Sequence, residues 1–278
     1  MLRTSAVLLS LLFATSSFAQ EDGLPPVKFR GGEFNFTRNA DDEISVTFDG
    51  KEIYHNYYVT FDRIVKIDDT DVALLSGGDG GNACGLSTLI VTRPEDKADP
   101  KVEKVGDGCA GAPDAAVAAH EIQFVPYLRP GQTAVVQNWT PEKGLTQSGA
   151  LTFLPTPNSG WTTLDLKAID HPYTLFDNAD VYKVAKETLG DRFDDVIIGL
   201  DVSGDPEIVE GKSIITSGCQ AHNCGGADSF FAVDIVNHTI YAGKQLNETE
   251  NQYWPEDLDK WPEPFQKAAK DWKPTEAP

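Results

Sequence analysis

One short stretch of the sequence combines residue types that could do chemistry together. Cys219 and Cys224 lie five positions apart, bracket His222, and have glycines on both sides. If the thiols are oxidised, they close a small ring that holds one imidazole outward. If they are reduced, the thiols and the imidazole suit a zinc site or a Cys–His nucleophile pair. The candidate site is therefore the loop formed by Cys219, Gln220, Ala221, His222, Asn223 and Cys224.

The first residues of the chain favour the oxidised form. Residues 1–19 are typical of a secretory signal, with Arg3 as a thin positive region, a short apolar core at 6–14, and a small-x-small cleavage site at 17–19. We therefore expect a periplasmic or secreted protein, in a compartment where disulfides persist. No later apolar run is long enough to cross a membrane.

Four cysteines in an exported protein predict two disulfides. We expect the local pairs Cys84–Cys109 and Cys219–Cys224, because each pair brackets a glycine-rich segment. Zinc is the alternative for the second pair together with His222. A structural zinc site needs a fourth ligand, however, and the other two cysteines are far away in the sequence. We therefore expect disulfides and no metal.

The chain is strongly acidic, with a formal net charge of −20. Nucleic acid is not expected as a partner, because its phosphates are bound by Lys and Arg. An acidic surface suits a cationic partner, whose association it would steer, and it suits simple solubility equally well. Charge alone does not decide between these two explanations.

The elements that must position the loop begin with a β-rich domain at residues 20–160. Short strands bounded by turn residues recur at roughly ten-residue spacing, which predicts an antiparallel sandwich, barrel or curled sheet. The alternating strand at 43–48 ends at Asp49-Gly50, a favourable hairpin turn. Further elements are expected as separate strands at 57–61 and 64–67 and as a short helical turn at 113–120.

A small α+β module is expected at residues 161–250, after a linker at 155–160. One helix should begin after an N-cap at Asn178 and stop at Gly190. Residues 192–200 fit a second helix or a buried strand, and we favour the helix. An antiparallel sheet with the helices on one side completes an α+β fold, with strands at 207–210, 212–216, 230–236 and 239–242.

The tail, residues 251–278, differs from the module before it. Its tryptophans, Trp254, Trp261 and Trp272, are seven and eleven residues apart. We expect this strip to pack back onto the body of the protein. A tail that binds a partner is the alternative.

Signatures of catalysis and of cofactor binding are missing from the sequence. There is no Gly-x-Ser-x-Gly nucleophile elbow, no phosphate-binding loop and no dinucleotide-binding fingerprint in a strand-to-helix setting. No segment has the spacing of an EF-hand calcium loop. We therefore expect a binding protein without a cofactor, and not an enzyme.

The segment from Ser217 to Ala242 resembles the inhibitor of vertebrate lysozyme family, the Ivy-like proteins. The hallmark of that family is a loop Cys-Lys-Pro-His-Asp-Cys, and this chain keeps both cysteines and the histidine in register. It has Gln220, Ala221 and Asn223 where the hallmark has Lys, Pro and Asp. The resemblance extends over residues 171–245 and leaves the β-rich domain outside it.

The resemblance implies a function for the loop. In the family, a disulfide closes the loop, which enters the active-site cleft of C-type lysozyme with its histidine near the two catalytic carboxylates. The chain would then be an exported inhibitor of C-type lysozyme or a related muramidase, with His222 as the plug. The loss of the proline should loosen the loop, and Asn223 should bind more weakly than the aspartate of the hallmark.

A second hypothesis assigns the loop a purely structural role. The chain would be a structural or interaction protein of the cell envelope, with the loop as a staple of the fold and His222 as a surface residue. A third hypothesis, an enzyme or metal protein that uses the two thiols, requires them to be free. The class of lysozyme, the role of the β-rich domain and the oligomeric state do not follow from the sequence.

Overall fold

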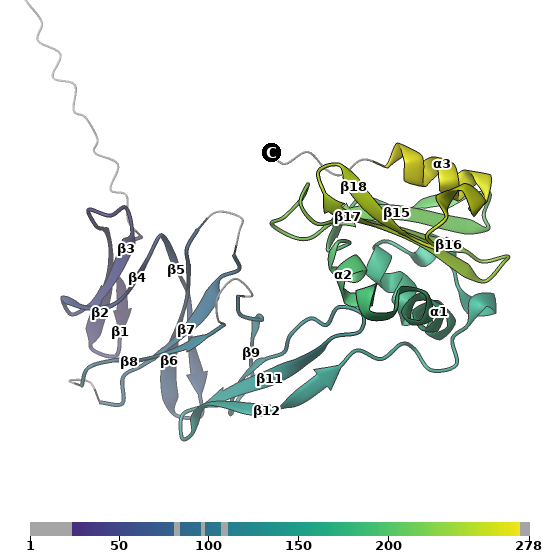
Figure 1. The fold of residues 1–278 in the computed structure, drawn as a ribbon. Helices are drawn as coiled ribbons and strands as arrows, with labels where there is room; N and C mark the ends of the chain where they lie inside the picture. Colours follow the sequence, from purple (N-terminus) through teal and green to yellow (C-terminus); the bar gives the residue numbers. More distant parts are fainter. Residues whose placement is uncertain (1–23, 81–83, 96–97, 107–110, 273–278) are drawn as a thin grey trace, which may run out of the picture.

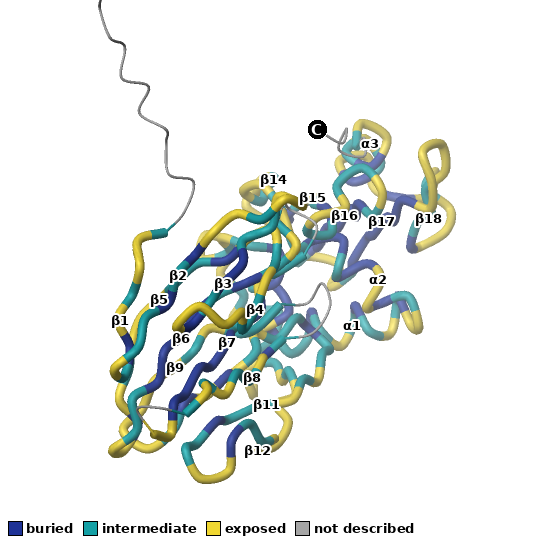
Figure 2. Tube along the Cα trace, turned by 90° about the vertical axis from the view of Figure 1, so that its left-hand side faces the viewer, coloured by how far each residue is buried: buried dark blue, intermediate teal, exposed yellow. Residues whose placement is uncertain are grey.

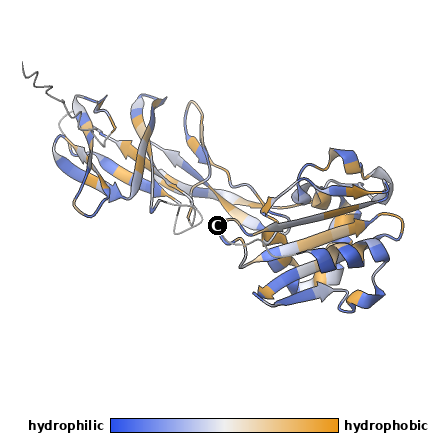
Figure 3. Cartoon of the chain, turned by 90° about the horizontal axis from the view of Figure 1, so that it is seen from above, coloured by the Kyte–Doolittle hydropathy of each residue, from blue (hydrophilic) through white to orange (hydrophobic). Residues whose placement is uncertain are grey.

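The computed structural model describes residues 24–80, 84–95, 98–106 and 111–272. The proposed signal at residues 1–19 therefore lies outside the described residues. Figure 1 shows an N-terminal part made of strands and a C-terminal module in which helices pack on a sheet. Strands β11 and β12 run from one part towards the other. Seen from above, the N-terminal sheets and the module follow one another along the molecule (Figure 3).

The N-terminal part is built from three antiparallel sheets, each with four strands. The first contains β1 (Val27–Phe29), β2 (Gly32–Arg38), β3 (Ile44–Phe48) and β4 (Lys51–Asn56). The second contains β5 (Tyr58–Ile67), β6 (Thr70–Gly78), β7 (Ser87–Thr92) and β8 (Lys101–Val105). The third contains β9 (Ala115–Val117), β10 (Ile122–Phe124), β11 (Thr133–Thr140) and β12 (Gly144–Thr152).

The middle sheet is buried on both of its faces. Leu75 of β6 belongs to an apolar cluster with Phe34 of the first sheet. Leu74, the preceding residue, points the other way and shares a cluster with Phe124 and Trp139 of the third sheet. The central strands β6 and β7 therefore each contain a continuous buried apolar run, at residues 72–75 and 89–91, within the dark blue parts of the tube in Figure 2. The three sheets form a stack of three layers.

In the N-terminal part, the sequence predicted one hairpin turn correctly and two other elements wrongly. Asp49 and Gly50 connect β3 and β4 with φ angles of 49° and 83°. The strands expected at 57–61 and 64–67 are one strand, β5, whose register shifts between Phe61 and Arg63. The helical turn expected at 113–120 is also wrong. Residues 115–117 of it form β9, because pairing with β10 outweighs the helical propensity of the alanines.

The C-terminal module has one antiparallel sheet in the order β13-β15-β16-β17-β18, and β14 also pairs with β15. Its strands are β13 (Val202–Ser203), β14 (Glu207–Val209), β15 (Ser213–Cys219), β16 (Asp228–Asp234), β17 (Thr239–Asn247) and β18 (Glu250–Trp254). Its α-helices are α1 (Ala179–Leu189), α2 (Phe193–Ile198) and α3 (Glu263–Asp271). Short 3-10 helices are η2 (Trp161–Thr163), η3 (Leu166–Ala168), η4 (Pro172–Asp177), η5 (Gly190–Arg192) and η6 (Leu258–Lys260).

Helix α1 begins and ends where the sequence predicts. The Asn178 side chain accepts hydrogen bonds from the backbone N–H groups of Asp180 and Val181, which caps the helix. Gly190 ends it in a conformation with φ of 52°. The alternative for residues 192–200 is also decided, because α2 is a helix that buries Val196 and Ile197.

The module's sheet is covered on both faces. Phe231 and Val233 of β16 pack in the cluster that contains α1 and α2. Their neighbours Phe230 and Ala232 face the opposite side, where they pack with Trp261 and with helix α3. The tail therefore packs onto the body, as expected. Because it supplies α3, the sheet has helices on both faces (Figure 1), whereas the sequence predicted helices on one face.

The two parts of the chain meet through side chains and main-chain bonds. Arg129 Nε donates to Asp201 Oδ1 at 2.7 Å, and Phe153 packs on Tyr182. The predicted linker is fixed to the module, because the N–H of Thr156 donates to the carbonyl of Asp177 at 2.8 Å. The segment at 155–160 therefore follows the surface of the module instead of leaving it.

Candidate functional site: the Cys219–Cys224 loop

The candidate loop connects β15 and β16 at one end of the module's sheet. The two strands stay paired as far as Cys219 and Asp228. Within the loop, Cys219 and Cys224 form a disulfide with their Cα atoms 4.9 Å apart. Cys219 is buried. Cys84 is disulfide-bonded too, and its expected partner, Cys109, lies outside the described residues.

His222 lies at the tip of a tight turn. The N–H of Asn223 donates to the carbonyl of Gln220 at 2.9 Å. His222, the third residue of the turn, has a φ of 65°, whereas Ala221 does not have a positive φ. This is the pattern of a type II turn, in which the third residue is left-handed. The His222 side chain is exposed, and its imidazole makes no hydrogen bond or ion pair within the described residues.

The second half of the loop turns back with the help of two glycines. The N–H groups of Gly226 and Ala227 both donate to the carbonyl of Asn223 at 3.1 Å. A Cβ on Gly226 would lie 2.5 Å from Asn223 Oδ1, so a side chain there would require the Asn223 side chain to move. Gly225 has a φ of 85°, and its N–H donates to Asp228 Oδ1 at 2.7 Å.

Three buried polar side chains, those of Asp228, Lys244 and Gln245, hold the base of the loop. Gln245 Nε2 donates to the carbonyl of Gly225 at 2.7 Å, and its Oε1 accepts from the N–H of Asp228 at 3.4 Å. Lys244 Nζ donates to the carbonyl of Ala227 at 3.1 Å. Burial lowers the pKa of Lys244, against the opposing effect of Asp228 and another nearby aspartate. The loop is therefore fixed from below as well as by its disulfide.

Sequence reasoning identified the loop and missed these supports. Lys244 and Gln245 follow a run of apolar residues in β17, and both are nearly inaccessible to solvent. Polar residues that continue a buried strand need hydrogen-bond partners, so the pattern in β17 could have indicated that these two side chains support the loop. Asp228, the first residue of β16, is also buried.

The geometry limits what the loop can do chemically. The disulfide consumes both thiols, so neither a cysteine nucleophile nor thiolate ligation is available there. Among the described residues, no three His, Cys, Asp or Glu side chains are grouped as metal ligands would be. The loop offers an imidazole and main-chain groups for contact with a partner.

A groove of about 530 Å³ lies elsewhere in the module, between α3 and β15, with Trp272 in its lining.

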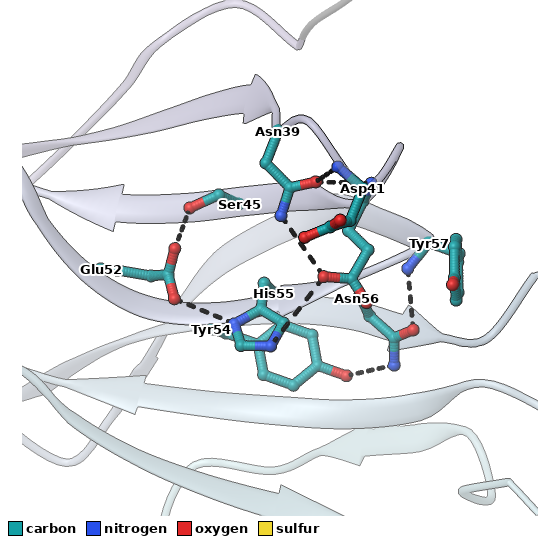
Figure 4. Close-up of polar contacts among 9 residues, drawn as sticks. Asn39, Asp41, Ser45, Glu52, Tyr54, His55, Asn56 and Tyr57 are labelled. Atoms are coloured by element: carbon teal, nitrogen blue, oxygen red, sulfur yellow. Dashed lines mark hydrogen bonds and ion pairs between the residues drawn. The ribbon is translucent and has the colours of Figure 1, made fainter.

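A second polar cluster lies on the first sheet (Figure 4). Ser45 Oγ donates to Glu52 Oε2 at 2.5 Å, and His55 Nδ1 lies 2.9 Å from Glu52 Oε1. The hydrogen bond with Glu52 raises the pKa of His55, helped by the charge of Glu43. The hydrogen bond from Ser45 lowers the pKa of Glu52. Because the serine donates to the carboxylate and not to the histidine, this is an ion-pair network without a serine nucleophile.

The remaining described histidines have structural partners or lie far from the loop. His171 caps η4 by accepting the N–H of Tyr173 at 3.2 Å. His238 stacks on Trp161 at the other end of the sheet, with ring centroids 4.9 Å apart. His120 lies beside Asp68 in the N-terminal part.

Comparison with known families identifies the fold around the loop. The family described as Inhibitor of vertebrate lysozyme (Ivy) matches residues 180–275. The C-terminal module is Ivy-like. The Ivy match contains the candidate loop and most of α1, and it continues through α3. Residues 251–275, most of the predicted tail, thus fall within the matched residues.

The N-terminal part matches a different family. The Y4bG N-terminal domain covers residues 30–152, which ends with the last strand of the third sheet. Across both parts, the chain is 25% identical over 233 residues to "Uncharacterized protein y4bG" of Sinorhizobium fredii (strain NBRC 101917 / NGR234). The alignment covers 84% of each chain. No solved structure matches the chain. No helix in the described residues is long and apolar enough to span a membrane.

Proposed function

We propose that the protein is exported and inhibits C-type lysozyme or a related muramidase by inserting the Cys219–Cys224 loop into the catalytic cleft. One observation carries the proposal within the Ivy-like module. His222 is exposed on a disulfide-closed turn, and its imidazole has no hydrogen-bonding partner within the described residues. The proposal needs no enzymatic activity and no cofactor in this chain.

The chemistry of a lysozyme cleft suits such a loop. The cleft holds two carboxyl groups on either side of the scissile sugar bond. An imidazole between them donates a hydrogen bond, and in its protonated form it adds an opposite charge. With a net charge of −20, the inhibitor attracts a cationic enzyme over a distance.

The bonds beneath the loop support binding by lowering its entropic cost. Immobilising a flexible side chain or loop on binding costs about 0.5–1.5 kcal/mol per side chain. Here the disulfide, the turn at Gln220–Asn223 and the Gln245 hydrogen bond order the main chain before any partner arrives. The affinity then depends mainly on the contacts of His222 and its neighbours.

The test is inhibition of purified C-type lysozyme by purified residues 20–278. We expect inhibition by the wild type and more than tenfold weaker inhibition by His222→Ala, a loss of about 1.4 kcal/mol or more. The matched control is His120→Ala, which removes another exposed histidine far from the loop. The envelope-protein alternative expects no inhibition of any C-type lysozyme or related muramidase, and that result would refute the proposal.

Export is tested separately, in cells. We expect the full chain to be recovered outside the cytoplasm with its N-terminus at Gln20. Recovery of uncleaved protein in the cytoplasm would contradict export and leave the inhibition assay as the test of the loop.

A further inference from the structure

Strands β11 and β12 form a ribbon that extends beyond the rest of the third sheet. Strand β10 pairs with β11 only at residues 137–139. Beyond that point, residues 133–136 of β11 pair with residues 149–152 of β12 and with no third strand. We call these eight residues the outer ribbon. It lies in the stretch that leads to the Ivy-like module (Figure 1).

The outer ribbon is exposed and uncharged. All residues of β12 from Gln147 to Thr152 are exposed, although they alternate between the two faces of the strand. Val135 is 45% exposed and Leu151 is 42% exposed. Neither β11 nor β12 contains a charged residue, in a chain of which 24% is charged.

Strand β12 differs from the other sheet edges in this respect. In the described part of the chain, every other edge strand of five or more residues carries at least one charge. These strands are β4 with Lys51 and Glu52, β5 with Asp62, Arg63 and Lys66, β8 with Lys101, Glu103 and Lys104, and β18 with Glu250. Charged side chains on an edge prevent another chain from pairing with it. The edge of β12 lacks this protection over nine residues.

A two-stranded ribbon without a covering layer is only marginally stable in water. Its free N–H and C=O groups along β12 can pair with an added strand. A bulge at Ser148, opposite Val136 and Gln137, interrupts the inner half of β12 and leaves residues 149–152 as the regular edge. Leu154, 79% exposed, lies just beyond that edge.

We propose that the outer ribbon is a self-association surface, on which β12 pairs antiparallel with β12 of a second copy about a two-fold axis. The absence of charge along β12 favours this occupant, because an identical edge brings no like charges against it. Two copies at −20 each repel one another elsewhere, so this strip is where they meet at the lowest electrostatic cost. A cationic partner is attracted instead to the acidic surfaces. Identical edges fit a closed two-fold dimer, and pairing would join two four-stranded sheets into one of eight strands.

Sedimentation equilibrium of residues 20–278 tests the proposal. We expect a reversible dimer for the wild type and a monomer for Leu151→Lys and for Leu151→Glu, because like charges then face each other across the axis. An equimolar mixture of the two variants should restore the dimer. The control Gln123→Lys adds a charge to an exposed residue of the same sheet away from this edge, and it should stay dimeric. Far-UV circular dichroism spectra that overlay the wild-type spectrum establish that the variants fold.

Three results would overturn the proposal. The first is a wild type that is monomeric at every concentration. The second is a dimer that Leu151→Lys leaves intact, because the interface then lies elsewhere. The third is a failure of the mixed variants to restore the dimer. Lysozyme inhibition by Leu151→Lys should be unchanged, because the proposed inhibitory loop lies outside the ribbon.

Discussion

The side chain of Gln245 donates a hydrogen bond to the carbonyl of Gly225 at 2.7 Å and so ties strand β17 to the loop that carries His222. The same side chain accepts from the N–H of Asp228 at 3.4 Å, where β16 begins. A single amide thus connects the two strands and the loop between them. In the proposed inhibitor, this connection sets the direction in which the loop leaves the sheet.

Replacement of this amide should weaken both the fold and the inhibition. Gln245→Ala removes the side-chain partner of the buried Asp228 N–H and of the half-buried Gly225 carbonyl, which costs about 1–3 kcal/mol. We expect a lower melting temperature and faster dissociation from lysozyme, measured by surface plasmon resonance. Gln123→Ala removes an exposed amide in the N-terminal part and should change neither quantity. Unchanged dissociation in Gln245→Ala would mean that the loop keeps its geometry without this bond.

The turn at the loop tip should accept a proline. Ala221 is the second residue of the turn, a position that favours proline in type II turns, and its N–H makes no hydrogen bond within the described residues. Ala221→Pro should stabilise the turn by about 0.4–1 kcal/mol by restricting the unfolded chain. We expect slower dissociation from lysozyme with the same histidine contact. Ala221→Val, which adds bulk without fixing φ to the same degree, should not reproduce the gain.

Features set by neighbouring residues were predictable from the sequence. The Asn178 cap and the Gly190 stop define α1 through local hydrogen bonds and a positive φ. The Asp49-Gly50 hairpin follows from the ability of these two residues to adopt a positive φ angle. The disulfide between Cys219 and Cys224 follows from a spacing that brings the two strand ends together.

Features set by contacts between distant segments were not predictable in this way. The burial of β6 on both faces depends on sheets that come from residues before and after it in the chain. The placement of α3 depends on Phe230, Ala232 and Tyr241, which present the apolar face that α3 covers. The strand β9 likewise depends on pairing with β10, which the local sequence at 113–120 does not show.

The contact between Arg129 and Asp201 should hold the N-terminal part against the module. The Asp201 carboxylate also accepts from the Tyr173 hydroxyl, and burial together with this carboxylate raises the pKa of Tyr173. Arg129→Ala should destabilise the protein by about 1–2 kcal/mol, less than for a fully buried pair because the arginine side chain is 38% exposed.

Two measurements check the effect of Arg129→Ala. Thermal unfolding reports the loss of stability, and small-angle X-ray scattering reports whether the two parts become more mobile. Arg38→Ala, which breaks an exposed pair with Asp42 in the first sheet, is the control and should leave the scattering curve unchanged. A scattering curve of Arg129→Ala that overlays the wild type would show that other contacts fix the two parts.

The buried Lys244 should make the stability rise with pH in the alkaline range. Burial lowers the pKa of this ammonium in the folded protein below its ordinary value of 10.5. Below the folded pKa the group is charged in both states, so the folded protein bears the full cost of burying the charge. Above 10.5 it is neutral in both states and the cost is gone. Stability is therefore gained between the two values, by about 1.4 kcal/mol for each pH unit that separates them.

The variant Lys244→Met isolates this contribution. Methionine fills a similar volume and does not titrate, so the variant has no pH dependence at this position, although it lacks the hydrogen bond to Ala227. We expect the free energy of unfolding of the wild type, minus that of Lys244→Met, to increase from pH 7 towards the ordinary pKa of lysine. Urea denaturation at a series of pH values measures it, and the exposed Lys183→Met should give a flat difference. A flat curve for Lys244→Met as well would mean that Asp195 and Asp228 offset the cost of burial in full.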